Sequence, residues 1–351
     1  MTNRCYYLTK DHRLFIREKE MPVPAKGEVI IRPMANSICG SDIRMYTLAH
    51  MGKSYIREDW PISMGHECSG IITELGSGVT GLKTGQHVVI EPGIYCRRCH
   101  NCMTGRYNIC DTFNFTSGTD PDDVECVEGH GTGSMRDYLA VPQHMIHVIP
   151  DSLPFDVAAL AEPAAVAIHA VARAGNVMGK SAAVFGAGPI GIFVMQALMA
   201  AGVGTVTMIA PGQERLDMAM ERGATDFINT SKTETLPTYT FDIAIETAGS
   251  PVATAQMIEV VKRGSTIVQV GWLSEDALMN IYEFNWKELN YYGAVDYAGE
   301  FPTAVQWLAD GRIDGAAMIT KRFAFEELSE AFRYTADNPK KCIKTVIIHD
   351  T

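Results

Sequence analysis

The order of apolar and polar positions changes once along the chain, near residue 154. Before that point, short apolar and β-branched runs are bounded by Gly or Pro, for example at 28–32, 70–74 and 87–90. Short strands separated by turn residues are typical of an irregular β-rich domain. After it, the segment from Phe155 to Ala174 is rich in Ala and carries apolar residues at helical spacing, which predicts a helix.

Beyond that helix, strand-like and helix-like segments alternate. We expect strands at 182–185, 205–209, 241–246 and 266–270, with helices at 190–201, 214–222 and 251–262. This alternation predicts a parallel, doubly wound sheet, so the fold class is α/β with a second, β-rich domain. After Gly293 we expect helices at 302–310 and 326–336, a short strand between them, and a last strand at 342–348.

Composition and charge narrow the class of protein. The 351 residues are 46% apolar and 20% charged, which suits a globular protein of two or three domains. A net charge of −11 disfavours nucleic acid and anionic membranes as partners, because both attract clustered Lys and Arg. Glycines interrupt the uncharged stretch between Lys180 and Glu214, so it does not predict a membrane span. Residues 1–20 lack an apolar targeting segment, and we expect a soluble, cytoplasmic protein with reduced thiols.

Four of the nine cysteines lie close together in the spacing C-x2-C-x2-C-x7-C, at Cys96, Cys99, Cys102 and Cys110. Four thiolates can surround a tetrahedral Zn²⁺ and leave no open position, which predicts a structural zinc site. An iron–sulfur cluster would use the same ligands, and reduced thiols disfavour two disulfides. We expect the cysteines that belong to no metal motif to be packing or surface thiols: Cys5, Cys68, Cys126 and Cys342.

A second group of ligand types is spread along the chain. Cys39 lies in Cys39-Gly40-Ser41-Asp42, His66 and Glu67 are adjacent, and Glu162 precedes Pro163. Each residue alone has an ordinary structural explanation. Together they offer a thiolate, an imidazole and a carboxylate, and three protein ligands with one open position form the arrangement of a catalytic zinc.

The segment Gly186-Ala187-Gly188-Pro189-Ile190-Gly191 reads G-x-G-x-x-G between an expected strand and an expected helix. That context predicts a dinucleotide-binding loop, with the pyrophosphate on the helix N-terminus.

In this motif an acidic residue about 20 positions after the glycines usually binds the adenosine ribose. Here the expected position is occupied by Ala210, which has no carboxylate. Losing the carboxylate would suit a 2′-phosphate, yet no Arg follows at Pro211 or Gly212. Arg215 is the nearest cation, and Glu214 is an alternative carboxylate. On balance we expect NAD rather than NADP.

Taken together, these motifs resemble the zinc-dependent medium-chain alcohol and polyol dehydrogenases, specifically the sorbitol dehydrogenase-like branch. The resemblance covers nearly the whole chain and includes Glu91-Pro92-Gly93, Gly105-Arg106-Tyr107-Asn108 and Ala167-Ile168-His169-Ala170. It implies a GroES-like catalytic domain at 1–153 and 294–351, with a structural zinc lobe at about 92–112. It implies a Rossmann dinucleotide-binding domain at 154–293.

The same resemblance implies the chemistry. A hydride passes between a secondary alcohol of a polyol, like sorbitol, xylitol or a cyclitol, and NAD(P), which gives a ketone. It implies a catalytic zinc on Cys39 and His66 with Glu67 or Glu162 as carboxylate partner, a structural zinc on the four clustered cysteines, and Ser41 as proton acceptor. Homo-oligomers, tetramers or dimers, are implied as well. The implied cofactor contacts are Gly186, Gly188, Pro189, Ile190, Gly191, Ala210, Arg215 and Val270.

Substrate-binding positions of that branch correspond here to Tyr46, Phe115, Asp296 and Tyr297. The chain departs from the branch in two of its pocket residues, because Asp296 replaces an Arg and Arg44 replaces a His. One hypothesis is that Asp296 favours a modified polyol, such as an amino polyol. The alternative is that Asp296 pairs with Arg44 and leaves the preference unchanged.

Other functions stay open. The chain is alternatively a dehydrogenase of threonine or of a simple secondary alcohol, or a catalytically silent binding relative. A zinc-ribbon nucleic-acid protein is disfavoured, because only Arg97, Arg98 and Arg106 supply positive charge near the cysteines. The acidic stretch 117–131 reads as a solvated surface insertion.

Overall fold

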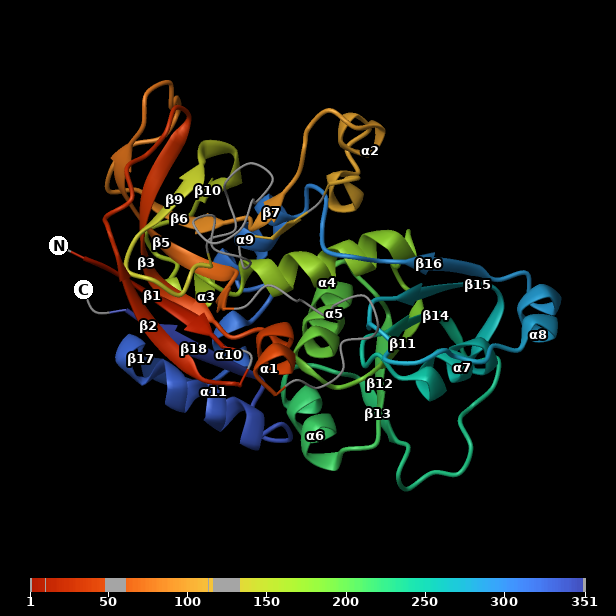
Figure 1. The fold of residues 1–351 in the computed structure, drawn as a ribbon. Coiled ribbons are helices and arrows are strands. Elements are labelled where there is room, and N and C mark those ends of the chain that lie inside the picture. Colours follow the sequence, from red (N-terminus) through yellow and green to blue (C-terminus); the bar gives the residue numbers. More distant parts are fainter. Residues whose placement is uncertain (1, 10, 48–60, 113, 116–132, 350–351) are drawn as a thin grey trace. The chain divides into compact units, whose positions relative to one another are not determined.

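The computed structural model describes residues 2–9, 11–47, 61–112, 114–115 and 133–349, with the backbone alone at 114 and 115 (Figure 1). These residues form two compact units. The first holds the described residues up to Glu162 and those from Ile319 onward, and the second runs from Pro163 to Met318. These units change at 162/163 and 318/319, and the domain boundaries expected at 153/154 and 293/294 stay predictions.

The first unit is built on a sheet of seven strands. Its order is β10-β6-β5-β3-β18-β17, and β9 also pairs with β3. The strands are β3 (Glu28–Ser37), β5 (Glu67–Leu75), β6 (His87–Ile90), β9 (Leu139–Pro142), β10 (Ile146–Val148), β17 (Ile319–Ala324) and β18 (Lys344–Ile348). Alternating residues of the strands, such as Val29, Ile31 and Val88, are buried in one core because successive side chains point to opposite faces.

A second apolar core lies beside an N-terminal hairpin. Strand β1 (Asn3–Leu8) pairs with β2 (Leu14–Lys19) and with β4 (Ile62–Ser63). The core contains Leu8, Ile62, Phe325 and Phe332, so the hairpin packs with the last helix, α11 (Leu328–Asp337). Outside the cysteine-rich lobe, the other short helices of the first unit are α1 (Gly40–Thr47), η2 (Gln143–Met145), α3 (Phe155–Ala158) and η3 (Phe325–Glu327).

The cysteine-rich lobe of the first unit has little regular structure. It contains β7 (Gly93–Ile94), α2 (His100–Met103), η1 (Tyr107–Ile109) and β8 (Asn114–Phe115), and β7 pairs with β8. Helix α2 has four residues, too few to be stable in isolation. The lobe therefore needs another source of order.

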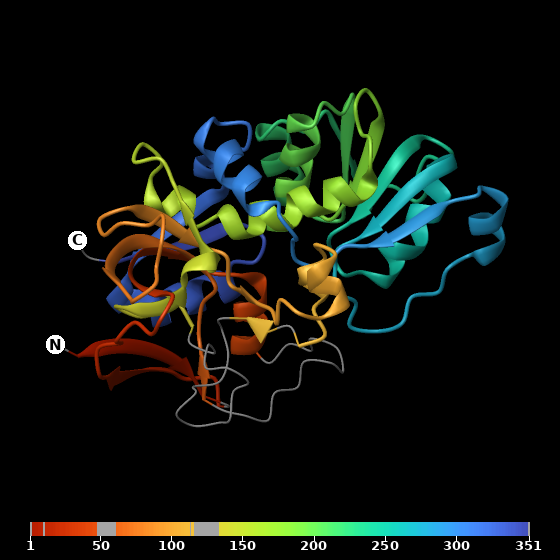
Figure 2. The same ribbon diagram turned by 90° about the horizontal axis from the view of Figure 1, so that it is seen from above.

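The second unit contains a parallel six-stranded sheet in the order β13-β12-β11-β14-β15-β16. In chain order this is 3-2-1-4-5-6, the order of a dinucleotide-binding doubly wound fold. The strands of this sheet are coloured green to blue in Figure 2. Its strands are β11 (Ser181–Phe185), β12 (Thr205–Ala210), β13 (Asp226–Asn229), β14 (Phe241–Glu246), β15 (Val261–Gln269) and β16 (Asn290–Gly293). Its helices are α5 (Pro189–Ala200), α6 (Gln213–Glu221), α7 (Pro251–Val260), α8 (Ile281–Trp286), α9 (Phe301–Ala309) and α10 (Gly315–Met318). Helix α4 (Ala161–Ala174) leads into it.

The predicted fold class is confirmed, and the strand expected at 241–246 has those bounds. The apolar segment Phe155–Ala174 contains α3 and α4 rather than one helix. By length and composition it could cross a membrane, yet 78% of its apolar window is buried inside the protein, as in a core helix.

The sequence did not predict β1, β2, β13, α8 or β16. The acidic stretch 117–131 and Cys126 lie outside the described residues. Of the cysteines expected to be packing or surface thiols, Cys5, Cys68 and Cys342 are buried, as in packing positions.

Candidate metal centres and nucleotide loop

Cys39, His66 and Glu67 come together in the first unit. Their ligand atoms lie within 4.8 Å of one another, with His66 and Glu67 buried and Cys39 half-buried. Cys39 directly precedes α1, and Glu67 begins β5. Gly65 turns the chain into His66 with a φ of 91°, and a Cβ there would lie 2.6 Å from Met135 Cγ. The local backbone therefore fixes two donors at the start of one strand.

Asp42 contacts two members of this cluster, Cys39 and His66. Its side chain is fully buried and accepts the Cys39 N–H at 3.0 Å, and its other oxygen lies 3.8 Å from His66 Nδ1. Burial by itself would lower the pKa of His66, but the Cys39 thiolate and Asp42 raise that pKa well above its usual value. The surroundings thus favour a cation. A soft thiolate, an imidazole and a carboxylate are the donor types that zinc takes, so the residues fit that ion.

Lys344 is a partner of the cluster that sequence reasoning missed. Its ammonium group donates to both Glu67 carboxylate oxygens, at 2.8 and 2.6 Å, and to Ile38 O at 3.0 Å. Both side chains are almost completely buried. The two residues are 277 positions apart, and no spacing signal links them.

Glu162, the other predicted carboxylate, lies on α4 and is 6% exposed. It does not belong to the group within 4.8 Å, but its charge contributes to the raised pKa values of His66 and Lys344. Ser41 is half-buried, and its N–H donates to Cys39 Sγ at 3.5 Å. The catalytic roles of Ser41 and Glu162 stay predictions.

Cys96, Cys99, Cys102 and Cys110 form the second group of possible metal ligands, with sulfur atoms within 4.8 Å of one another. Backbone N–H groups point at the sulfurs: Cys99 N–H donates to Cys96 Sγ at 3.3 Å, and Cys96 N–H donates to Cys110 Sγ at 3.3 Å. Backbone N–H groups, first that of Arg98, lower the pKa of Cys96 to about 6. Such hydrogen bonds favour thiolates, and the donor set fits a closed structural zinc.

In the second unit the glycine loop joins β11 to α5. Gly188 is the N-cap of α5, Pro189 occupies its first turn, and Gly186 has a φ of 102°. A Cβ on Gly191 would lie 1.9 Å from Gly186 O, whereas a Cβ on Gly188 would meet nothing within 4 Å. Gly191 thus permits the close approach to Gly186 in the turn. Gly188 leaves room above the helix N-terminus, and this space fits a dinucleotide pyrophosphate.

The other predicted cofactor contacts lie at the same edge of the sheet. Ala210 ends β12 and is buried, Arg215 is half-buried on α6, and Val270 follows β15. The carboxyl ends of parallel strands form the edge at which doubly wound folds bind ligands. Sequence reasoning missed Thr247, whose hydroxyl donates to Phe185 O at 2.9 Å and to Gly186 O at 3.2 Å and so braces the loop.

The predicted substrate residues fall into both units. Tyr46 packs with its ring 5.5 Å from that of Phe332 in the first unit, and the Phe115 backbone pairs with Gly93. Tyr297 of the second unit is 2% exposed and packs edge-on against Phe301, and Asp296 has a φ of 50°. Their roles toward substrate, and the Asp296–Arg44 pair, stay predictions.

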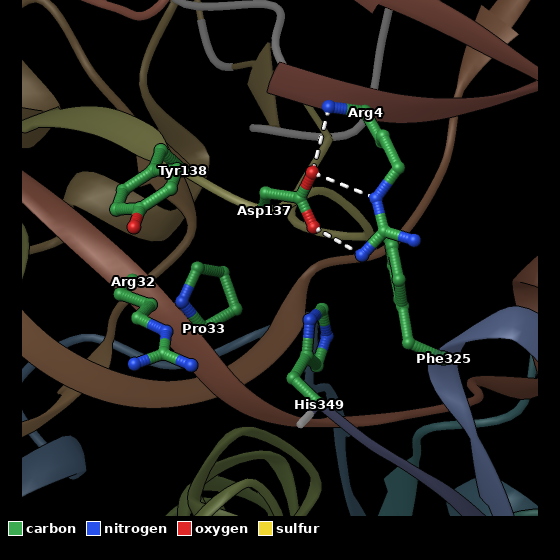
Figure 3. Close-up of a pocket in the computed structure, with 7 residues that line it drawn as sticks. All are labelled: Arg4, Arg32, Pro33, Asp137, Tyr138, Phe325 and His349. Carbon is green, nitrogen blue, oxygen red and sulfur yellow. Dashed lines mark hydrogen bonds and ion pairs between the residues drawn. The ribbon is translucent and has the colours of Figure 1, made fainter. Parts of the chain in front are cut away.

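A cavity of about 220 Å³ lies in the first unit, and none of the proposed metal ligands lines it (Figure 3). Arg4 lines it and makes hydrogen bonds at 2.8–3.0 Å to Asp137. His349 lies opposite, with Nε2 2.8 Å from Asn36 Oδ1 and its ring stacked on Phe325. Burial lowers the pKa of His349 to about 3.

Comparisons with known proteins agree with this arrangement. Residues 25–151 match the alcohol dehydrogenase GroES-like domain, and residues 189–310 match the zinc-binding dehydrogenase domain. The sorbitol dehydrogenase of Bacillus subtilis is 35% identical over 342 residues, which cover 95% of this chain and 94% of that protein. The crystal structure of an Escherichia coli oxidoreductase of unknown specificity is 31% identical, covers 100% of both chains and has a TM-score of 0.90.

Two other similar crystal structures hold different cofactors. An Escherichia coli alcohol dehydrogenase contains NADH, at 26% identity and a TM-score of 0.87. A Sinorhizobium meliloti zinc-binding dehydrogenase contains NADP, at 25% identity and a TM-score of 0.86. Both matches cover 99% of each chain.

The chain therefore belongs to the zinc-dependent medium-chain dehydrogenases, in their polyol dehydrogenase branch, as its motifs predicted. It is an oxidoreductase that acts on CH–OH donors.

Proposed function

We propose that this protein oxidises a secondary alcohol of a polyol to a ketone, and catalyses the reverse reduction, with NAD(P). The observation that carries the proposal is the cluster of Cys39, His66 and Glu67. It offers three different donor types, and it is partly open to solvent at Cys39, which is only half-buried. A closed structural site would not need that opening. The glycine loop of the second unit supports a nicotinamide cofactor as the hydride carrier.

The residues divide the work as follows. Cys39 and His66 hold the catalytic zinc, and Glu67 or Glu162 supplies the carboxylate, directly or through water. When bound, zinc supplies a Lewis acid for the substrate hydroxyl and NAD(P) supplies the hydride acceptor. Ser41 accepts the proton that leaves the hydroxyl group. Asp42 keeps His66 oriented through their buried contact at 3.8 Å, and Lys344 fixes the Glu67 carboxylate.

The proposed substrate is an uncharged or amino-bearing polyol. The sorbitol dehydrogenase relative supports a sorbitol-like or xylitol-like molecule. Asp296 brings a carboxylate where the branch has an Arg, and a carboxylate attracts an ammonium group and repels acids and phosphates. Kinetics of Asp296→Asn on a neutral polyol and an amino polyol test this idea. We expect a selective loss on the amino polyol, and equal losses on both would contradict it.

A turnover panel tests the proposed function. Sorbitol, xylitol, a cyclitol, an amino polyol, threonine and 2-butanol are each offered with NAD and NADP, with and without a chelator. We expect polyol turnover that the chelator abolishes. Turnover of threonine or 2-butanol alone would instead favour those alternative specificities, and no turnover at all would favour a silent relative.

A matched pair of variants ties activity to the cluster. Cys39→Ala removes a proposed ligand, whereas Cys68→Ala removes a buried cysteine outside both metal groups. We expect Cys39→Ala to lose turnover and one zinc per chain by metal analysis, and Cys68→Ala to keep both zinc ions. Retention of both ions in Cys39→Ala would contradict the proposed ligand set.

We also propose a cytoplasmic homo-oligomer that associates through the β16 edge of the second unit. Among the described residues β16 pairs only with β15, so its outer backbone groups face no strand. Large apolar side chains beside it are exposed, including Ile281, Tyr282 and Trp286 on α8. An exposed strand edge with apolar neighbours favours pairing with a second copy. Sedimentation of Tyr292→Lys together with Trp286→Glu tests this, and we expect a shift toward monomer.

A further inference from the structure

The edge of the sheet where the adenosine ribose binds has no acidic side chain from β12. Its last residue is Ala210, at the position where a carboxylate selects the ribose 2′-hydroxyl of NAD. Gly212, two residues on, has open space, because a Cβ there would meet nothing within 4 Å. A group larger than a hydroxyl can therefore approach this corner without meeting a fixed negative charge.

The neighbouring strand brings polar groups to the same corner. Strand β13 runs parallel to β12, with Asn229 opposite Ala210, so the residues after β13 emerge at the same edge. Asn229 Nδ2 and Lys232 Nζ each donate to Gln213 Oε1 at 2.9 Å. Ser231 donates its hydroxyl to Asn229 Oδ1 at 2.6 Å. An ammonium group and a hydroxyl group thus converge beside the end of β12.

The charge of Lys232 is not neutralised by an acid in the described part of the chain. Its acceptor is a neutral amide, and the described residues place no carboxylate within 4.0 Å of Nζ. The nearest acid in this network, Asp217, accepts from the other end of the same amide, Gln213 Nε2, at 2.8 Å. Lys232 is exposed, so its flexible side chain can exchange the amide for a stronger, charged acceptor.

We propose that this corner binds the 2′-phosphate of NADP, with Lys232 as the phosphate-binding cation, so that the enzyme prefers NADP to NAD. This rests on the proposed dehydrogenase function and reverses the preference expected from the sequence. Residues 210–215 belong to the end of β12 and the start of α6, whereas Lys232 comes from the loop after β13. Two effects act together: a carboxylate that would repel phosphate is absent, and a cation that attracts it is present.

Binding of adenosine nucleotides tests the proposal without turnover. Calorimetry on the zinc-loaded enzyme compares 2′,5′-ADP, which carries the extra phosphate, with 5′-AMP. We expect 2′,5′-ADP to bind about tenfold more tightly, the scale of one hydrogen bond to a charged group. Equal binding, or tighter binding of 5′-AMP, would overturn the proposal.

Two substitutions and one control make the test specific. Lys232→Gln should weaken 2′,5′-ADP about tenfold and leave 5′-AMP unchanged. Lys180→Gln removes the same charge beside the start of β11, at the opposite end of the parallel strands, and should change neither ligand. Ala210→Asp should weaken NADPH, measured by its fluorescence on binding, and strengthen NADH. An Ala210→Asp enzyme with unchanged preference, or a Lys180→Gln loss equal to that of Lys232→Gln, would contradict the site.

The same measurements separate this inference from the proposed function. If neither NADH nor NADPH binds, the dehydrogenase function fails. If NADH binds and NAD⁺ supports polyol oxidation while NADPH does not bind, only the 2′-phosphate site fails.

Discussion

At the scale of single residues, the chemistry of the first unit depends on buried charges that neutralise one another. Glu67 and Lys344 are the clearest case, because each is almost fully removed from water and each has the other as its ion-pair partner. A buried pair adds little net stability, yet removing one partner leaves an uncompensated charge. The pair therefore acts mainly to fix the carboxylate beside Cys39 and His66.

Lys344→Met is expected to destabilise the protein by about 3–5 kcal/mol, because the Glu67 charge stays buried without its partner. Urea unfolding of the full chain measures this loss, followed by hydrogen exchange of the first-unit strands β3, β5 and β18. The double variant Lys344→Met with Glu67→Gln should recover part of it, since no charge remains. A single variant as stable as the parent would show that the pair is not buried in solution.

His349 predicts a pH dependence of stability. Burial lowers its pKa to about 3 from 6.5 in the unfolded chain, so the folded protein holds the neutral ring. The stability that this preference contributes is fully present above pH 6.5 and is lost as the pH falls toward 3. At about pH 5 the loss should be about 2 kcal/mol. His349→Gln keeps a donor for Asn36 and should lose less stability than the parent between pH 7 and 5. Parallel pH curves for the two proteins would contradict this explanation.

Several site residues were predictable and others were not. The four clustered cysteines were predictable because their spacing is visible in the sequence, whereas Cys39 and His66 were predicted from ligand type and from the family resemblance. Lys344 and Lys232 were not, because each reaches its site through strand pairing rather than through a local motif. Asp42 stood within a recognised motif, yet only its burial reveals its contact with His66.

At the scale of elements, some segments were predictable from their local sequence pattern and others depend on pairing with a neighbouring strand. The strand, turn and helix around the glycine loop followed from apolar runs and glycines, and the structure confirms them as β11 and α5. Strands β13 and β16 have four residues each, and neither shows a clear apolar period. Their place in the sheet comes from pairing with β12 and β15, which no local pattern encodes.

Two glycines of one loop should respond differently to the same methyl group. Gly191→Ala places a Cβ 1.9 Å from Gly186 O, so it should lower the melting temperature of the cofactor-free protein and weaken cofactor binding. Gly188→Ala meets open space, so the cofactor-free protein should keep its melting temperature, while NAD(P)H affinity falls because the methyl group faces the pyrophosphate position. Thermal melts and fluorescence titrations separate the two outcomes. Equal destabilisation by both variants would contradict this loop geometry.

At the scale of the whole molecule, the two units differ in what stabilises their folded structure. The second unit has a parallel sheet with a continuous apolar core, including Phe185, Ile209 and Ile267. The first unit combines apolar cores with two groups of metal ligands, one of them in a lobe whose regular elements are very short.

Metal removal should therefore affect the units unequally. After dialysis against a chelator, hydrogen exchange should rise most in the lobe from Gly93 to Cys110 and near Cys39. Strands β11–β15 should keep their protection. Uniform loss of protection across both units would show that the metal sites stabilise the chain as one cooperative unit.

The pairing of β18 with β3 also sets a timetable for synthesis. Val346 lies opposite Ser37, so β3 must wait for its partner until β18 has been synthesised. The described part of the second unit, Pro163 to Met318, is translated in between and can fold while the first unit remains incomplete. Until β18 has been synthesised, Glu67 also lacks Lys344, and β3 lacks its strand neighbour at Ala35, Asn36 and Ser37. A chaperone that shields this part of β3 would have its longest opportunity on this chain during synthesis of the second unit.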